Sequence, residues 1–240
     1  MAGIRIYRAG QIGGCVTEII NGEHRIIIDF GANLPGAPED AMSDEEVIRE
    51  VFGTDSAPKG ADAVLFTHYH GDHVGLKTRI PEDIPLYAGE TAKEVMRIIA
   101  GRTDYLKRKK GQTEELELPV IDRMQPYWHV GSSKDFGGIR VTPFTVNHSA
   151  LDAYMFLLEV NGKRILYTGD FRDHGTMRPE TFENMIRTYV KKVDILVTEG
   201  TMVLRLDKTD IGGVRNEEEL GTEAGKELYP HPAACGRNAV

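Results

Sequence analysis

The stretch Thr67-His-Tyr-His-Gly-Asp-His-Val-Gly75 places four side chains that can bind a metal within six residues. Residues 63–66, directly before this stretch, are all apolar and indicate a buried strand that leads into the cluster. Successive side chains of an extended backbone point to opposite sides, so His68 and His70 share a side and can bind one cation. Beyond Gly71, where the chain can turn, Asp72 and His73 can face a second cation. Imidazole and carboxylate groups suit zinc and similar metals, so the spacing predicts a two-metal site.

The composition is that of a globular protein without a membrane span. Of the 240 residues, 40% are hydrophobic and 28% are charged, and no apolar stretch approaches the roughly 18 residues that a span requires. No long apolar block follows Arg5 and Arg8, so we see no secretory signal and expect a cytoplasmic protein. Cys15 and Cys235 form no CxxC pair, which argues against a disulfide framework or a thiolate zinc site.

The net charge of -8 provides no overall basic field that would attract nucleic acid. Bound divalent ions would offset part of this charge, so the total does not exclude a polyanionic substrate. One concentrated basic run, Lys107-Arg108-Lys109-Lys110, could contact phosphates. Such runs are more often solvated faces, and the sequence leaves both interpretations open.

Two Asn-Gly pairs, Asn21-Gly22 and Asn161-Gly162, indicate β-hairpins, because both residues accept the positive φ angles of a type I′ turn. The paired strands are expected at 16–20 with 24–29, and at 154–160 with 163–168. Further strands are expected at 4–8, 63–67, 85–88, 139–146 and 194–198.

Helices are expected at 43–51, 90–100 and 179–190. In the second of these, Ala92, Val95, Met96 and Ile99 form a stripe that should face the core. Sheets interleaved with helices imply an α/β domain with the helices outside. The periodicity weakens after about Leu206, so we predict a main domain over 1–206 and a C-terminal appendage over 207–240.

Four ligands from one loop do not complete two coordination shells, so distant residues must contribute. His148 follows the alternating strand expected at 139–146. Asp170 follows the strand expected at 163–168, and Gly169 before it leaves room for the backbone. Single residues of these types at strand ends are often only turn formers. Both are candidates to complete the two shells, and the residue pattern by itself leaves the turn-forming alternative open.

The motif His68-x-His70-x-Asp72-His73, followed by a histidine and then by Gly169-Asp170, resembles the metallo-β-lactamase superfamily of metal-dependent hydrolases. The match spans roughly residues 4–201, and Asp29 in Ile28-Asp-Phe-Gly31 resembles the first acidic motif of that family. The resemblance implies an αββα sandwich with the metals in a cleft along one edge.

The resemblance also implies two divalent metal ions, expected to be zinc. The implied ligands are His68, His70 and His148 for the first ion and Asp72 and His73 for the second, with Asp170 bridging the two. Asp29 would orient a loop or a ligand without binding metal. Asp72 would also be catalytic, because it is placed to orient a metal-bound hydroxide.

A second resemblance concerns the strand that ends in Glu199, within Val193-Asp-Ile-Leu-Val-Thr-Glu-Gly-Thr201. It is similar to the acidic motif of the β-CASP nucleases, which include ribonuclease J and the mRNA 3′-end cleavage factors. Tyr167-Thr-Gly-Asp-Phe-Arg172 fits the same group. The resemblance implies single-stranded RNA as substrate and places Glu199 beside the ligands, at the junction with the β-CASP domain. The alternative is a glutamate that only caps a loop.

The chain also departs from that pattern. β-CASP nucleases continue for a further domain and return with more histidines, whereas only His231 follows here, between two prolines that match no family motif. His174 is more typical of a surface loop. The sequence therefore implies a truncated sandwich that lacks its C-terminal part and most or all of the β-CASP insertion. Its second metal would have few ligands, and an uncovered edge would favour a homo-oligomer.

Three functions remain open. The first is metal-dependent cleavage of RNA phosphodiester bonds. The second is hydrolysis of a small substrate by the same fold, with a thioester or lactone as the bond that is cut. The third is a non-catalytic truncated domain that keeps one metal and serves as a binding module.

Overall fold

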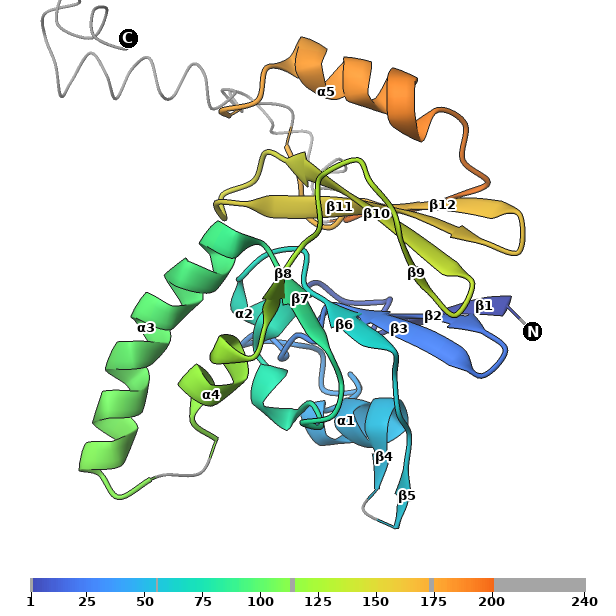
Figure 1. The fold of residues 1–240 in the computed structure, drawn as a ribbon. Coiled ribbons are helices and arrows are strands. Elements are labelled where there is room, and N and C mark those ends of the chain that lie inside the picture. Colours follow the sequence, from blue (N-terminus) through green and yellow to red (C-terminus); the bar gives the residue numbers. More distant parts are fainter. Residues whose placement is uncertain (1, 55, 113–114, 173–174, 201–240) are drawn as a thin grey trace, which may run out of the picture. The chain divides into compact units, whose positions relative to one another are not determined.

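The computed structural model describes residues 2–54, 56–112, 115–172 and 175–200. Residues Met1–Glu199 belong to one compact unit. Two β-sheets stack face to face in this unit, with helices on both outer faces (Figure 1). The predicted αββα class is confirmed. The predicted domain boundary after residue 206 and the appendage 207–240 lie outside the described residues.

The first sheet has six strands in the order β1-β2-β3-β6-β7-β8. The first three strands pair antiparallel, and β3, β6, β7 and β8 run parallel. Parallel strands end at the same edge of a sheet, so the segments after β3 and β6 emerge side by side. The strands are β1 (Ala2–Tyr7), β2 (Val16–Asn21), β3 (His24–Ile28), β6 (Ala63–Leu65), β7 (Leu86–Ala88) and β8 (Gln125–Pro126).

The second sheet has the order β13-β12-β11-β10-β9. All neighbours are antiparallel except β12 and β13, which are parallel. Its strands are β9 (Lys134–Phe136), β10 (Ile139–Val146), β11 (Ala153–Val160), β12 (Lys163–Tyr167) and β13 (Ile195–Val197). A separate two-stranded ribbon consists of β4 (Gly53–Thr54) and β5 (Ala57–Pro58).

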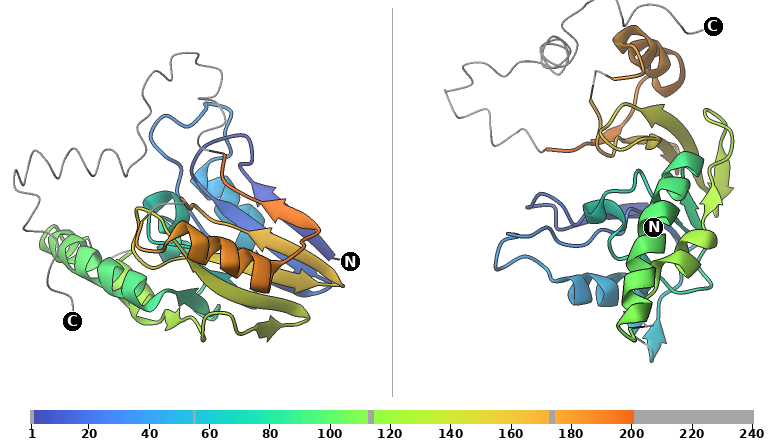
Figure 2. Two further views of the ribbon diagram at one scale, coloured as in Figure 1. Left: turned by 90° about the horizontal axis from the view of Figure 1, so that it is seen from above. Right: turned by 90° about the vertical axis from the view of Figure 1, so that its left-hand side faces the viewer.

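The helices cover the outer faces of the sandwich. On the first sheet lie α1 (Asp44–Phe52), α2 (Gly71–Val74), the 3₁₀ turn η1 (Lys77–Arg79), α3 (Glu90–Lys109) and α4 (Glu117–Asp122). On the second sheet lies α5 (Pro179–Met185), which continues into a π-helical turn, η2 (Ile186–Val190). Figure 2 shows α5 lying over the second sheet.

Alternation along the strands divides the apolar core into layers. Ile26 and Ile28 pack between the two sheets, against Phe156 and Leu158 of β11. Ile27, which points the other way, packs in the cluster beneath the helices of the first sheet. On the outer face of the second sheet, side chains of β11 and β12 pack against α5 and η2. Each strand near the predicted metal residues is therefore fixed from two sides.

One of the two predicted hairpin turns is shifted by a residue. Asn161 and Gly162 both have positive φ, 48° and 72°, and form the predicted two-residue turn between β11 and β12. In the first hairpin Asn21 pairs with His24, so the turn consists of Gly22 and Glu23. Asn21 stays in the strand because its side-chain amide donates to the carbonyl of Gly137 at 3.0 Å.

Helix α3 is longer than predicted and buries a different stripe. It continues through Gly101 to Lys109. The predicted core position Ile99 is wrong, because its side chain is 57% exposed. The buried positions are Ala92, Met96, Ala100 and Asp104, spaced by four residues. Asp104 accepts hydrogen bonds from the backbone N–H groups of residues 117 and 118, which begin the unpredicted helix α4.

Among the described residues, no helix is both long enough and apolar enough to cross a membrane. Strand β13 lies at the end of the second sheet, and Ile195 and Leu196 in it are 40% and 57% exposed. Exposed apolar residues on a terminal strand are compatible with pairing to another chain, and self-association remains a prediction.

Candidate metal centre

Four chain segments converge at one edge of the sandwich. Asp29 follows β3 and the histidine motif follows β6, and these two strands are parallel neighbours. His148 follows β10 and Asp170 follows β12, both in the second sheet. The two sheets are joined at this edge by the backbone N–H of Tyr154, which donates to the carbonyl of Thr67 at 2.9 Å.

Three imidazoles form the first group of possible ligands. His68 Nε2 and His70 Nδ1 are 3.1 Å apart, and His148 Nε2 is 3.3 Å from His70 Nδ1. One ring nitrogen of each residue lies within 4.8 Å of the other two. His68 is buried, whereas the other two are partly exposed. These are the residues predicted for the first metal, and the structure brings them together.

A second group combines His68, His73 and Asp170. His73 Nε2 lies 3.5 Å from Asp170 Oδ1 and 3.8 Å from Asp72 Oδ2. Asp170 Oδ2 is 3.9 Å from His148 Nε2, so this carboxylate lies between the two groups, as expected for a bridging ligand. Asp72 borders the second group through His73. Asp72 and His73 are both on the one-turn helix α2, where the sequence indicated only a turn.

Asp29 lies behind the imidazoles, in neither group. Its fully buried carboxylate accepts hydrogen bonds from the Thr67 backbone N–H at 2.7 Å and from Thr67 Oγ1 at 2.9 Å. It also contacts His73 Nδ1 at 2.8 Å. A carboxylate on Nδ1 makes that nitrogen the proton carrier and turns Nε2 toward Asp170. Asp29 therefore contacts a possible ligand from behind, and its orienting role stays a prediction.

Thr67 is a functional position that the motif analysis missed. Its hydroxyl lies 3.0 Å from His68 Nδ1 and 3.3 Å from His73 Nδ1 while it also donates to Asp29. One buried hydroxyl therefore links the orienting carboxylate to an imidazole of each group. The signal was present in the sequence, since a hydroxyl residue directly precedes the first histidine.

Glu199 contacts the loop that carries the bridging carboxylate. Its Oε1 accepts the backbone N–H of Phe171 at 2.9 Å, one residue beyond Asp170. Glu199 belongs to neither group of possible ligands. It therefore holds the Asp170 loop, and its predicted role beside the ligands stays a prediction.

Burial keeps three of the imidazoles neutral. Burial, together with repulsion from His73 and His148, lowers the pKa of His68 to about 2. Burial is also the main cause that lowers the pKa values of His70 and His148. A neutral imidazole has a free lone pair, which is the form that binds a metal.

His73 and Asp170 shift in the opposite sense. Burial alone would lower the pKa of His73, but the Asp29 and Asp170 carboxylates outweigh it and raise that pKa well above the usual range. Burial likewise opposes ionisation of Asp170, yet His73 holds the pKa of its carboxyl below the ordinary value. The second group therefore favours an ionised carboxylate beside a cation.

One atom shows that this donor set fits a metal. His73 Nε2 is buried and has no hydrogen-bond partner among the described residues, although it faces two carboxylates. A buried nitrogen without a partner is unfavourable unless a cation or proton binds there. Four imidazoles and two carboxylates are a typical donor set for two zinc or similar divalent ions. His174 and His231 lie outside the described residues.

The loop between β1 and β2 closes tightly over the cluster. The backbone N–H of Cys15 donates to the carbonyl of Asp72 at 2.8 Å, and burial raises the pKa of the Cys15 thiol. A Cβ atom on Gly31 would lie 1.7 Å from the same Asp72 carbonyl oxygen. Only glycine allows this approach of two backbones, so residue 31 helps to fix the position of Asp72.

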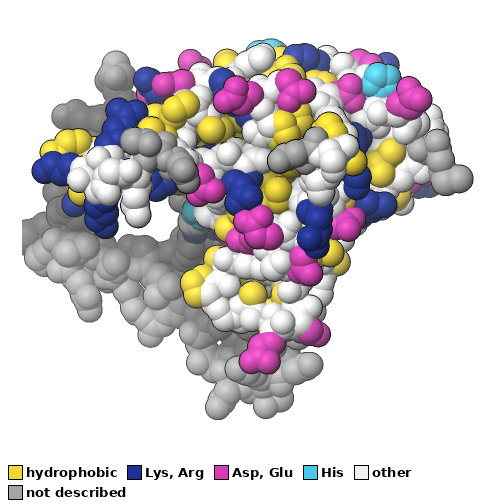
Figure 3. Space-filling view, turned by 90° about the horizontal axis from the view of Figure 1, so that it is seen from below, with side chains coloured by type: hydrophobic (Ala, Val, Ile, Leu, Met, Phe, Trp, Pro, Cys, Tyr) yellow, Lys and Arg dark blue, Asp and Glu magenta, His cyan; other side chains and the backbone are white. Residues whose placement is uncertain are grey.

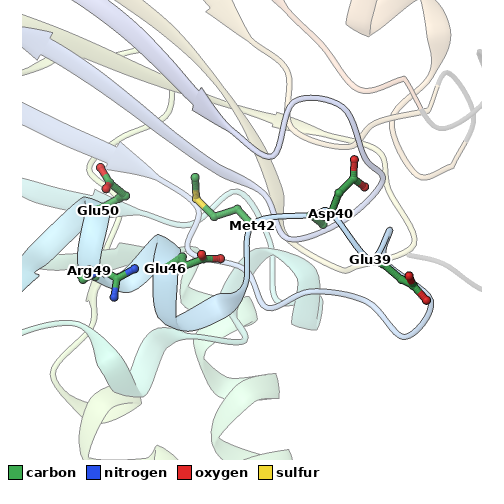
Figure 4. A pocket seen from close by; sticks show the side chains of 7 residues that line it. Glu39, Asp40, Met42, Glu46, Arg49 and Glu50 are labelled. Carbon is green, nitrogen blue, oxygen red and sulfur yellow. The ribbon is translucent and has the colours of Figure 1, made fainter.

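A shallow pocket lies away from this cluster (Figure 4). Its side chains come from the loop before α1 and from α1 itself. They are mostly acidic and include none of the residues predicted to bind metal. The lining residues are Glu39, Asp40, Ala41, Met42, Glu46, Arg49 and Glu50.

Family membership follows from a sequence match that covers most of the chain. Residues 24–218 match the family described as the Beta-lactamase superfamily domain. The chain belongs to the metallo-β-lactamase superfamily. Its two groups of histidine and aspartate donors, within the residues that the structure describes, could each hold a metal ion.

The curated relatives that the chain matches include proteins named as ribonucleases. The chain is 30% identical over 156 residues to Endoribonuclease YSH1 of Mycosarcoma maydis, which covers 58% of this chain and 17% of that protein. It is 26% identical over 201 residues to an RNase J-like protein of Methanocaldococcus jannaschii, covering 82% and 42%. A UPF0173 metal-dependent hydrolase of Natranaerobius thermophilus is 28% identical over 162 residues, covering 65% and 57%.

The chain therefore spans between 17% and 57% of the length of these three relatives.

Solved structures support the superfamily fold. A protein of unknown function from Enterococcus faecalis V583 aligns over 97% of this chain and 58% of its own, with a TM-score of 0.68 and 20% identity. A metallo-β-lactamase variant from Cronobacter sakazakii aligns over 94% and 84%, with a TM-score of 0.53 and 15% identity.

Asp152 anchors the loop that carries His148 to the first turn of α3. Asp152 has a positive φ of 63° and accepts the backbone N–H groups of Thr91 and Ala92, at 2.9 and 3.2 Å, at the start of α3. Replacing it by alanine should lower the free energy of unfolding by about 1 kcal/mol, a typical loss for a helix cap, and should weaken zinc binding. Urea unfolding and zinc titration would measure both effects.

Asp152→Asn is the matched control, because asparagine tolerates a positive φ and its amide oxygen can accept the same bonds. It should retain most of the stability. An alanine variant with unchanged zinc affinity would show that the His148 loop does not depend on this anchor.

Proposed function

We propose that this protein cleaves phosphodiester bonds of single-stranded RNA in a metal-dependent reaction. The observation that carries the proposal is the pair of donor groups that share His68 and have Asp170 between them. Two adjacent cations held in this way are suited to an in-line displacement at phosphorus. The names of the relatives from Mycosarcoma maydis and Methanocaldococcus jannaschii also point to RNA.

When bound, two divalent cations would provide a nucleophile from water at neutral pH and stabilise negative charge on the phosphoryl oxygens. The residues of the chain hold and orient the reactants. The side chain of Asp72 is 20% exposed beside His73, where it can accept a proton from the attacking water. Asp29 keeps the His73 ring in place from behind, and Glu199 holds the loop of Asp170.

A small-substrate hydrolase is the second candidate. The relative from Natranaerobius thermophilus, named only as a metal-dependent hydrolase, is matched over a larger share of its length than either RNA-processing relative. The same cations would then activate water toward a thioester or lactone carbonyl. A domain that keeps one metal and binds without turnover is the third alternative.

Turnover of a substrate panel tests the proposal. The zinc-loaded protein would be incubated with a labelled single-stranded RNA of twelve nucleotides, a duplex of the same sequence, an acyl thioester and a lactone, each with and without EDTA. We expect EDTA-sensitive cleavage of the single strand and little turnover of the two carbonyl substrates. Faster hydrolysis of thioester or lactone would reject RNA as substrate. About one zinc per chain without any turnover would support the binding module.

A further inference from the structure

Helix α3 presents to solvent a row of side chains that the metal centre does not use. Ile98 is 76% exposed and Tyr105 is 57% exposed, and the side chains of Arg102 and Lys109 are also exposed. The spacing of these four residues, i, i+4, i+7 and i+11, places them on one side of a helix with 3.6 residues per turn. We call these four residues the outer face of α3.

In the part of the chain that the structure describes, the cations on this half of α3 have no carboxylate partners. Arg102, Arg108, Lys109 and Lys110 form no ion pair within the described ranges, whereas Arg97, one turn earlier, pairs with Asp122 at 2.9 Å. The acid in this half, Asp104, is buried and caps α4. No carboxylate of the described residues therefore compensates this positive charge, in a chain with a net charge of -8.

An aromatic ring lies among these charges. Lys109 Nζ is 5.1 Å from the centroid of the Tyr105 ring, and that ring is otherwise open to solvent. In the view from below, Lys and Arg side chains gather beside hydrophobic ones at the left, the side on which α3 ends in Figure 1 (Figure 3). Cations that alternate with an exposed ring are a recurrent arrangement for binding single-stranded nucleic acid.

We propose that the outer face of α3 binds the single-stranded RNA that extends from the metal centre. Arg102 and Lys109 would contact phosphates, and Tyr105 would stack on a base. The inference rests on the proposed function, because it assumes that the strand enters the site as a substrate.

The helix connects this face physically to the site. The first turn of α3 donates two backbone hydrogen bonds to Asp152, in the loop that also carries His148. From there the 20 residues of α3 extend for about 30 Å, at 1.5 Å per residue. A strand with the stacked spacing of 3.4 Å per nucleotide would cover this distance with roughly nine nucleotides. RNA of that length could touch both the metal centre and Lys109.

The order of side chains along the face favours a nucleic acid over a membrane. An interfacial helix separates a charged face from an apolar face, so that the apolar face can enter the lipid. On α3 the cation Arg102 lies between Ile98 and Tyr105 on the same face, and insertion would bury its charge. A nucleic acid strand, in which phosphates alternate with bases, matches this order.

Charge reversal provides the test. Fluorescence anisotropy would measure binding of a 5′-labelled twelve-nucleotide single strand to the full chain in EDTA, which prevents cleavage, over a series of salt concentrations. The test variant is Arg102→Glu/Lys109→Glu. The matched control is Lys191→Glu/Lys192→Glu, which makes the same charge change at two exposed lysines before β13. Thermal midpoints and zinc content would show that both variants are folded.

We expect the α3 variant to bind the strand at least tenfold more weakly, and the control variant less than twofold. The slope of log K against log salt should decrease by about 1.4 for two lost phosphate contacts on a single strand. Tyr105→Ala should weaken binding severalfold without changing that slope. Equal losses in the two charge variants, or no loss in either, would overturn the proposal. Binding to phosphatidylserine vesicles that depends on α3, with RNA binding unchanged, would also overturn it.

Failure of this inference can be distinguished from failure of the proposed function. If the wild-type protein binds RNA through α3 but zinc-loaded protein cleaves none, the cleavage proposal fails and the binding face stands. If RNA is cleaved but the α3 variant binds and cleaves it as the wild type does, the binding face is rejected and the cleavage proposal stands.

Discussion

Replacing Asp72 by alanine should lower RNA cleavage by about 10²–10⁴-fold, the range typical for loss of a group that transfers a proton in the transition state. The Asp72 carboxylate is partly exposed and lies 3.8 Å from His73 Nε2, at the border of the second donor group. Its backbone carbonyl accepts the N–H of Cys15, and alanine keeps that hydrogen bond. Initial rates on the labelled single strand, with zinc in excess, would measure the loss.

Thermal unfolding of the same variant should change little, because this carboxylate is partly exposed. Asp40→Ala provides the matched control, since it removes an exposed carboxylate from the acidic pocket near α1. It should cleave at the wild-type rate. An Asp72→Ala protein that retains full activity would contradict both the catalytic role of this residue and the phosphodiesterase proposal built on it.

Replacing Asp29 by alanine should have the largest effect on stability, lowering the free energy of unfolding by roughly 3–5 kcal/mol. The carboxylate is fully buried. It accepts hydrogen bonds from the backbone N–H and the hydroxyl of Thr67, and it contacts His73 Nδ1. Without it, buried donors lose their acceptor and the cationic form of His73 loses its counter-charge. Urea unfolding of the metal-free protein would measure the difference.

Asp62→Ala is the matched control for Asp29. Asp62 also accepts a backbone N–H, that of Arg25 at 2.7 Å, but its side chain is 32% exposed and water can replace it. We expect a loss of about 1 kcal/mol or less. Equal losses in the two variants would show that burial of Asp29 and its contact with His73 add nothing to stability. Asp29→Ala should also bind zinc more weakly at the second group.

Site residues that are close in the sequence could be predicted to act together, but those on different strands could not. The spacing of His68 and His70 after an apolar strand was sufficient to predict that they act together, because an extended backbone repeats every two residues. No such local rule connects Asp29 to His73. Their contact depends on the parallel pairing of β3 with β6, in which Ile28 lies beside Leu65. The resemblance to a known family, not the residue pattern, placed Asp29 behind the ligands.

For helix α3 the sequence predicted the helix but not which of its sides is buried. Its apolar residues allowed more than one buried stripe, and the prediction that included Ile99 was wrong. In the orientation that α3 adopts, Asp104 caps α4 and Met96 is buried in the core. Ile98 and Ile99 are then exposed to solvent. Which apolar residues of an amphipathic helix are buried depends on the partner that packs against it.

By itself the sequence determined the histidine cluster at the end of a buried strand, most of the strands and the superfamily, since these depend on short-range periodicity and on motif order. The family resemblance predicted that His148 and Asp170 join the cluster, whereas only the tertiary structure decided that Thr67 links its two groups and that the basic half of α3 faces solvent. The physical reason is that strand pairing and sheet stacking join residues far apart in the chain. The free energy of those contacts comes from burial and from hydrogen bonds that no local segment contains.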